Sequence, residues 1–165
     1  ACRAILQDAA GCLWSDKWKD GYHFDERKSG KDVTKNFNVK GGETVVTPAG
    51  TFENCLRVSF DFQAWGYFSG RSEYLFADGV GIVRFEHPYG EDKCAVWQLT
   101  EYKGTGKGFF PTDDGLFRRY EADALSDGWH GSVEYTFNED ENGTVMLKDA
   151  LGTQDRADYE KMKKK

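Results

Sequence analysis

The stretch ENCLRVSFDF, residues 53–62, decides the fold class. Apolar and polar side chains alternate in it, with Leu56, Val58, Phe60 and Phe62 set against Arg57, Ser59 and Asp61. Successive side chains of a β-strand point to opposite faces, so this period of two predicts a strand with one buried face. We expect Leu56, Val58 and Phe60 to be buried, and Arg57, Ser59 and Asp61 to be more exposed.

The same pattern continues on both sides of this stretch. Further strands are predicted at 32–39, 43–47, 72–77, 81–87, 93–102, 117–123, 132–138 and 144–148. Turn residues separate several of them, such as Pro48-Ala49-Gly50, Asp78-Gly79 and Pro88-Tyr89-Gly90. Connections this short cannot carry a parallel crossover, so consecutive strands should pair antiparallel. The sequence predicts a mainly β fold, either a curved antiparallel meander sheet or a partly closed barrel.

One domain is expected over residues 1–165, because this length suits a single core. Residues 1–31 are predicted to be helical or irregular. A short helix over 4–14 would place Ile5, Leu6, Ala9, Ala10 and Leu13 on one side. The meander should occupy 32–103, a glycine-rich loop 104–116, and the terminal strands with a basic tail 117–165.

Charge and hydropathy argue against a nucleic-acid partner and against a membrane-spanning segment. Asp and Glu number 28 against 22 Lys and Arg, and the formal net charge is -6. An acidic body repels phosphate backbones, which argues against nucleic acid. The apolar runs are far shorter than the roughly 20 residues that a spanning helix needs, so no membrane-spanning segment is expected.

The four cysteines, Cys2, Cys12, Cys55 and Cys94, have no C-x-x-C spacing. Neither a zinc knuckle nor a thioredoxin-like redox pair is therefore indicated. Two disulfides in any of three connectivities are one alternative. Buried free thiols are the other, and we favour them for Cys55 and Cys94.

Residues 43–102 contain VVTPAGTFENCLRV, then EYLFADGVGIVRFE, then an apolar strand ending in LTEY. This region resembles the TPAGTF…APGVGIV module of uncharacterised bacterial proteins, many of them lipoproteins or other envelope proteins. Asp78 stands where that pattern usually has Pro. The resemblance implies a curved antiparallel sheet and export from the cytoplasm, and it brings no catalytic residues. The motif residues Pro48, Gly50, Gly79 and Gly81 are interpreted as turn formers.

Catalytic and metal-binding motifs are missing from the sequence. His23, His87 and His130 each stand alone, outside any H-E-x-x-H or G-x-S-x-G setting. Residues 138–149 match part of an EF-hand loop, but their flanks are strand-like and position twelve is Asp149 rather than Glu, so we expect a metal-free hairpin. No catalytic residue, metal ligand or cofactor is assigned.

The sequence favours a non-catalytic β module of the bacterial envelope or exterior that acts in binding or assembly. Its partner would be a small apolar ligand, a glycan or another protein. Alternation places Trp97 and His87 on faces that could meet in an apolar concavity, with Trp97 in its wall and His87 at its mouth. The alternative for these two residues is a core tryptophan and a histidine bonded to a backbone carbonyl.

The rival hypothesis for the whole chain is a small hydrolase. It would use His87 in a cleft, or a carboxylate pair drawn from Asp61, Glu73, Glu86 and Glu101.

Overall fold

The computed structural model describes residues 17–64, 68–90, 93–111, 113–124, 129–139 and 145–155. They form one antiparallel sheet of nine strands whose order in space is the order in sequence. The strands are β1 (His23–Ser29), β2 (Asp32–Thr47), β3 (Gly50–Ala64), β4 (Phe68–Ala77), β5 (Gly81–Gly90), β6 (Lys93–Lys103), β7 (Phe117–Ala124), β8 (Trp129–Glu139) and β9 (Val145–Asp155). No helix within the described residues has the length and hydropathy needed to cross a bilayer.

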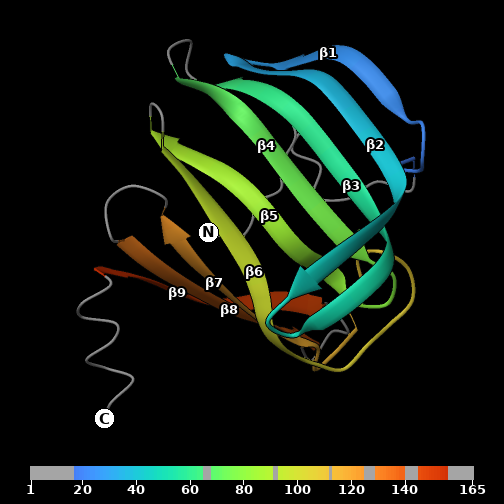
Figure 1. The fold of residues 1–165 in the computed structure, drawn as a ribbon, viewed down its shortest axis with the longest axis vertical. Coiled ribbons are helices and arrows are strands. Elements are labelled where there is room, and N and C mark those ends of the chain that lie inside the picture. Colours follow the sequence, from blue (N-terminus) through green and yellow to red (C-terminus); the bar gives the residue numbers. More distant parts are fainter. Residues whose placement is uncertain are drawn as a thin grey trace.

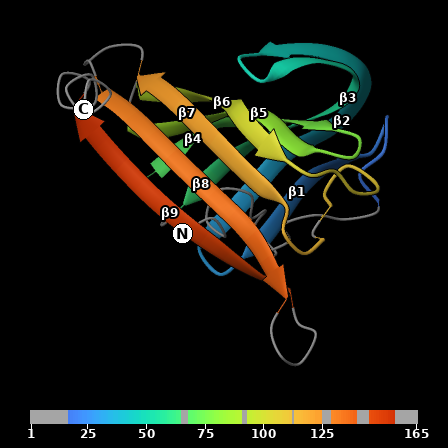
Figure 2. The same ribbon diagram turned by 90° about the horizontal axis from the view of Figure 1, so that it is seen from below.

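The sheet is strongly curved. Figure 1 shows β1 to β6 as a bent layer with β7 to β9 behind it, and Figure 2 shows these last three strands crossing below the others. The curvature gives the sheet an inner face, which carries Val58, Tyr74, Phe85 and Tyr120, and an outer face. Among the described strands β1 and β9 remain the two edges, so the sheet is open rather than a closed barrel.

The predicted meander is confirmed. Residues 53–62, 72–77, 81–87 and 93–102 lie in four consecutive antiparallel strands, β3 to β6. The two segments expected at 32–39 and 43–47 are one strand, β2, whose register with β3 shifts between Lys40 and Glu43. A bulge keeps the strand continuous while it bends, which explains the interrupted pattern at Gly41 and Gly42.

The N-terminal region differs in part from the expectation. Residues 23–29, which the sequence placed in a helical or irregular segment, form strand β1. Charged residues fill much of this stretch, and such a composition suits an edge strand that must not attract other strands. The helix expected over 4–14 lies outside the described residues.

The inner face holds the core. Leu56, Val58 and Phe60 are buried as expected, while Arg57 and Asp61 are partly exposed. Ser59 contradicts the expectation, because it is 6% exposed although it points to the outer face. Its register neighbours are Asn38 and Glu73, whose longer side chains flank this short one.

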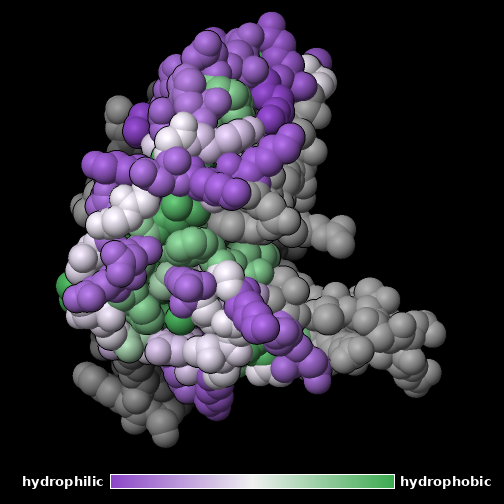
Figure 3. Space-filling model, turned by 90° about the vertical axis from the view of Figure 1, so that its right-hand side faces the viewer, coloured by the Kyte–Doolittle hydropathy of each residue, from purple (hydrophilic) through white to green (hydrophobic). Residues whose placement is uncertain are grey.

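One end of the curved sheet is closed by two chain segments. The β2–β3 hairpin bends over it, so that the Ala49 N–H donates to the Leu99 carbonyl of β6 at 3.1 Å. In the loop between β6 and β7, the Phe110 ring lies 6.3 Å from Phe76 of β4 and 6.4 Å from Phe137 of β8. We call this region the closed end. Seen from the side on which β2 bends, apolar side chains gather in the middle of the surface, below a hydrophilic area (Figure 3).

Candidate functional site: the aromatic ladder and the Trp97 end of the inner face

Six aromatic rings stack in one row across the inner face, one from each of the strands β1 to β6. We call this row the aromatic ladder, and its members are Phe24, Phe37, Phe60, Tyr74, Phe85 and Trp97. Neighbouring ring centroids are 4.7, 5.7, 6.1, 5.6 and 5.6 Å apart in that order, and their planes differ by 8° to 17°. Stacked rings at these separations attract each other beyond simple area burial.

Strand register produces the ladder. Phe24 pairs with Phe37, Tyr74 with Phe85, and Phe85 with Trp97. Phe60 lies diagonally to Tyr74, because Phe60 pairs with Ser72, which is two residues from Tyr74 on the same face. Cross-strand pairs of this kind stabilise a sheet and fix the register of its strands.

Burial divides the ladder into a core and two ends. Phe37, Phe60, Tyr74 and Phe85 are no more than 7% exposed, and burial raises the pKa of the Tyr74 hydroxyl. The end rings Phe24 and Trp97 are only partly buried. The four central rings are therefore core side chains, and the ladder does not offer a continuous aromatic surface on which a saccharide could stack.

Small residues adjoin Trp97. In the register, Trp97 pairs with Ala122 of β7, which pairs with Gly131 of β8, and the next inner-face position on β6 is Ala95. All three small residues are buried. These three positions carry small residues, whereas most inner-face positions carry large side chains. We call this group, Ala95, Trp97, Ala122 and Gly131, the Trp97 end.

The closed end is filled by larger groups. Tyr120 donates its hydroxyl to the Ile82 carbonyl at 2.7 Å and meets the Phe85 ring edge-on at 5.7 Å. Arg118 is 1% exposed, and its guanidinium donates to the carbonyls of Val80, Lys103 and Phe117 at 2.8, 3.1 and 2.7 Å. These bonds tie β7 to the β4–β5 turn and to the end of β6.

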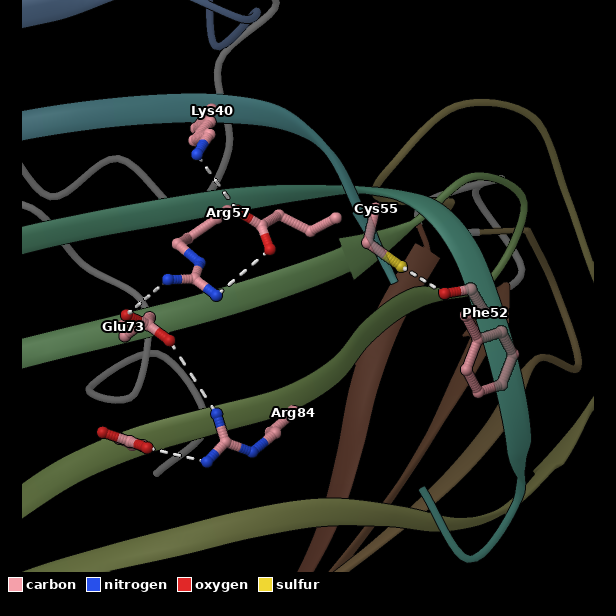
Figure 4. Close-up of polar contacts among 8 residues, drawn as sticks. Lys40, Phe52, Cys55, Arg57, Glu73 and Arg84 are labelled. Carbon is pink, nitrogen blue, oxygen red and sulfur yellow. Dashed lines mark hydrogen bonds and ion pairs between the residues drawn. The ribbon is translucent and has the colours of Figure 1, made fainter. Parts of the chain in front are cut away.

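Charged side chains form a network on the outer face (Figure 4). Arg57 contacts Glu43 at 3.2 Å and Glu73 at 3.7 Å. Arg84 contacts Glu73 at 3.8 Å and Glu86 at 2.7 Å. Carboxylates and guanidinium groups thus alternate across β2 to β5.

The carboxylates considered for a hydrolase are all engaged by arginines. Glu73 and Glu86 belong to the network just described, and Asp61 contacts Arg71 at 3.5 Å. Glu101 and Glu134 each lie 2.6 Å from Arg119, and the hydrogen bond that Arg119 donates to Glu134 contributes most to raising the pKa of that guanidinium. This is the arrangement of a solvated sheet face rather than of an acid pair in a cleft.

The other candidate groups are also placed by the structure. His23 is exposed, and its hydrogen bond to Asp25 at 2.7 Å is the largest cause of its raised pKa. His130 is 5% exposed and lies 3.6 Å from Glu121. Within the described residues, no three His, Cys, Asp or Glu side chains gather as a metal site would require.

Cys55 is a buried free thiol, as favoured from the sequence. Burial, assisted by the negative charge of Glu43, raises the pKa of this thiol to about 11. Its S–H donates to the Phe52 carbonyl at 3.4 Å (Figure 4). Cys2 and Cys12, and the side chain of Cys94, lie outside the described part of the chain.

The motif glycines have the turn conformations expected of them. Gly50, Gly79 and Gly81 have φ of 144°, 80° and 98°, a region that side chains disfavour. The Gly79 N–H donates to the Gly108 carbonyl at 2.7 Å, and the Gly106 N–H donates to the Gly79 carbonyl at 2.9 Å.

The GTGKG segment at 104–108, which belongs to the glycine-rich loop expected over 104–116, is thus hydrogen-bonded to the β4–β5 turn. These two segments line a shallow depression made largely of glycine backbone, with Asp78, Thr105 and Lys107 beside it. These hydrogen bonds, together with the positive φ of Gly79 and Gly108, explain the glycines at this contact.

The two residues predicted to line a ligand site have different outcomes. Trp97 is on the inner face as expected, stacked on Phe85 and only partly buried. His87 pairs with Ala95 in the register, which puts it on the strand position next to the Trp97 end, but its side chain lies outside the described residues.

Between β8 and β9, Glu139 pairs with Val145, so the strands of the expected hairpin at 138–149 are present; its turn is not described.

Sequence reasoning missed the aromatic ladder. Its signal was present, because each of the strands β1 to β6 carries an aromatic residue on its apolar face. The pattern of one strand cannot show which ring meets which, since that depends on register.

Comparison of the chain with protein-family models, with curated proteins and with solved structures gives no match.

Proposed function

We propose that this protein is a non-catalytic binding module that holds a small apolar ligand against the inner face at the Trp97 end. The observation that carries the proposal is the partly exposed indole of Trp97 beside three small residues, Ala95, Ala122 and Gly131. Ligand sites in proteins are typically apolar hollows with a few polar groups at the rim. We assign the rim position to His87, which pairs with Ala95 in the strand register.

The placement of the rings and of the carboxylates argues against a glycan ligand and against a hydrolase. A glycan requires exposed rings, and the four central rings of the ladder are buried. A hydrolase acting through a carboxylate pair would need acids in a cleft, whereas Asp61, Glu73, Glu86 and Glu101 lie on the outer face against arginines.

The proposed setting is the bacterial envelope or the cell exterior. Its support is the resemblance of residues 43–102 to the TPAGTF…APGVGIV module. In that region, Pro48 and Ala49 form the tip of the hairpin that bends over the closed end.

Titration of the full chain with decanoate and with the fluorescent probe 1-anilinonaphthalene-8-sulfonate tests the proposal. Trp97→Phe should weaken binding several-fold and change the unfolding midpoint little, because phenylalanine retains much of the packing on Phe85. The matched control is Trp18→Phe. Trp18 is 4% exposed and lies 5.3 Å from Phe37, so this variant should lose stability and keep its affinity.

The opposite result would contradict the proposal: a destabilised Trp97→Phe variant with unchanged affinity makes Trp97 a core residue. Hydrolysis of p-nitrophenyl esters or glycosides that is lost in Glu73→Gln would favour the enzyme instead.

A further inference from the structure

His23, at the start of edge strand β1, has a hydrogen-bond acceptor at each of its two ring nitrogens. Its Nε2 lies 2.7 Å from Oδ1 of Asp25, and its Nδ1 lies 3.0 Å from Oδ1 of Asn38 on β2. Carboxylate and amide oxygens only accept hydrogen bonds, and a neutral imidazole carries a single N–H. Both bonds therefore form together only when the imidazole has a proton on each nitrogen and a positive charge.

The orientation of the Asn38 amide is fixed by a second hydrogen bond. Its Nδ2 donates to the backbone carbonyl of Asn36 at 2.8 Å, which leaves Oδ1 facing the imidazole of His23. The opposite orientation would set two oxygens against each other at Asn36. Asn36 has a φ of 52°, at the register irregularity of β2, and its side chain donates to Asp61 of β3 at 3.0 Å. Groups from three strands thus position the acceptor of His23.

The surroundings of His23 favour its protonated form. The hydrogen bond to Asp25 is the largest cause of its raised pKa, and desolvation opposes this effect. Hydrogen bonds to Asn38 and to the backbone of Phe37 raise the pKa further, as does the negative charge of Asp25. The geometry and the direction of the pKa therefore agree on a protonated ring.

Other charged side chains near Asn38 on the outer face have partners of their own. Lys40, two residues along β2, contacts Glu43 at 3.8 Å. Asp61 of β3 contacts Arg71 of β4 at 3.5 Å and accepts the bond from Asn36. Among the described residues, Asp25 is the one whose charge acts on the pKa of His23.

The protonated ring holds the start of β1 in place. Its bond to Asn38 crosses from β1 to β2 at the first register pair of the two strands, and its bond to Asp25 lies within β1. Among the described strands, β1 has a neighbour on one side only. Such an edge opens at a lower free energy than the central strands do, so the loss of one contact affects it most.

We propose that His23 is a pH-dependent switch that ties the start of β1 to β2 when it is protonated and loosens this edge of the sheet when it is neutral. This property is independent of the proposed ligand binding. Because the pKa is raised in the fold, the stabilisation is fully present below the ordinary pKa of 6.5 and is lost as the pH rises through the higher pKa of the folded protein.

An NMR titration of the histidine rings in the full chain gives the pKa of His23, whose signal is identified by its absence in His23→Gln. The pKa should lie above 6.5 in wild type and fall toward 6.5 in Asp25→Asn. The matched control is Glu26→Gln on the same strand. Glu26 contacts Lys28 and Lys35, each at 3.7 Å, so this variant should leave the pKa of His23 unchanged.

Hydrogen exchange of the β1 amides measures the loosening itself, between about pH 5.5 and 8.5 and after correction for the intrinsic pH dependence of exchange. Each unit by which the pKa of His23 exceeds 6.5 should lower the protection of β1 about tenfold over this range. His23→Gln should lack this decrease. The Cys55 thiol does not contribute, because its pKa of about 11 lies above the range.

A pKa of His23 at or below 6.5 overturns the inference. So does a protection of β1 that falls with pH as steeply in His23→Gln as in wild type, since the pH dependence would then come from other groups. Asp25→Asn provides a second variant that retains the imidazole. Its β1 protection should fall with pH less than in wild type, in proportion to its lower pKa, and an undiminished fall would also refute the switch.

Discussion

Replacing Phe60 with alanine tests the idea that the aromatic ladder is the central element of the core. Phe60 is 7% exposed and stacks on two rings, Phe37 at 5.7 Å and Tyr74 at 6.1 Å. It is the third ring of six, so its removal separates Phe24 and Phe37 from the rest of the ladder.

The expected cost follows from the burial. Phe→Ala in a core lowers the free energy of unfolding by about 3–5 kcal/mol, through lost transfer free energy and the cavity that remains. Two stacked neighbours place the Phe60 variant toward the upper part of that range, because each aromatic pair adds about 0.5–1.5 kcal/mol. For a chain of this length, the unfolding midpoint should fall by roughly 6–20 °C.

Urea unfolding followed by tryptophan fluorescence measures the loss, with the slope of the transition used to check that unfolding stays two-state. Asp61→Ala is the control on the next residue of β3. Asp61 is on the outer face, 41% exposed and 3.5 Å from Arg71, so its loss should cost no more than about 1 kcal/mol. Equal midpoints for Phe60→Ala and wild type would refute the argument that the ladder carries the core.

Two further predictions concern buried groups. Arg118→Met keeps much of the side-chain volume but leaves the carbonyls of Val80, Lys103 and Phe117 without this donor. Because each unsatisfied group costs about 1–3 kcal/mol, this variant should lower the free energy of unfolding by about 3 kcal/mol or more. A loss below about 1 kcal/mol, measured by urea unfolding, would contradict this prediction. The second prediction concerns pH, because folding raises the pKa of the Cys55 thiol from an ordinary value near 9 to about 11. The fold favours the neutral thiol, so this contribution to the free energy of unfolding is fully present below pH 9 and is lost as the pH rises toward 11. Cys55→Ala should show a flatter decline of stability over that window than wild type, and parallel curves would show that the thiol does not titrate there.

Particular residues show which structural features could be predicted from the sequence. Alternation in 53–62 and in the neighbouring strands was enough to predict antiparallel strands, the burial of Val58 and Phe60, and the turn roles of Gly50, Gly79 and Gly81. Trp97 lies on the inner face, on the same side of β6 as Ala95 and Leu99, and its role in ligand binding stays a prediction. These features are local, because side-chain direction in a strand depends only on the backbone within it.

Other features were decided by contacts between distant parts of the chain. The burial of Ser59 follows from its neighbours Asn38 and Glu73 on adjacent strands. The engagement of Glu73 depends on Arg57 and Arg84, which come from the strands on its two sides.

The sequence by itself therefore determined the mainly β fold class, the consecutive antiparallel pairing of β3 to β6 and the inward faces of these strands, since a period of two and short turns leave few alternatives. Only the tertiary structure decided the aromatic ladder, the hairpin that closes one end, and the small residues that adjoin Trp97. Each of these depends on strand register and on bulges such as those at Asn36 and Asn54, where φ is 52° and 54°. A register shift of a single residue would turn a strand's inward side chains outward, and one strand's pattern does not record which residues its neighbour presents.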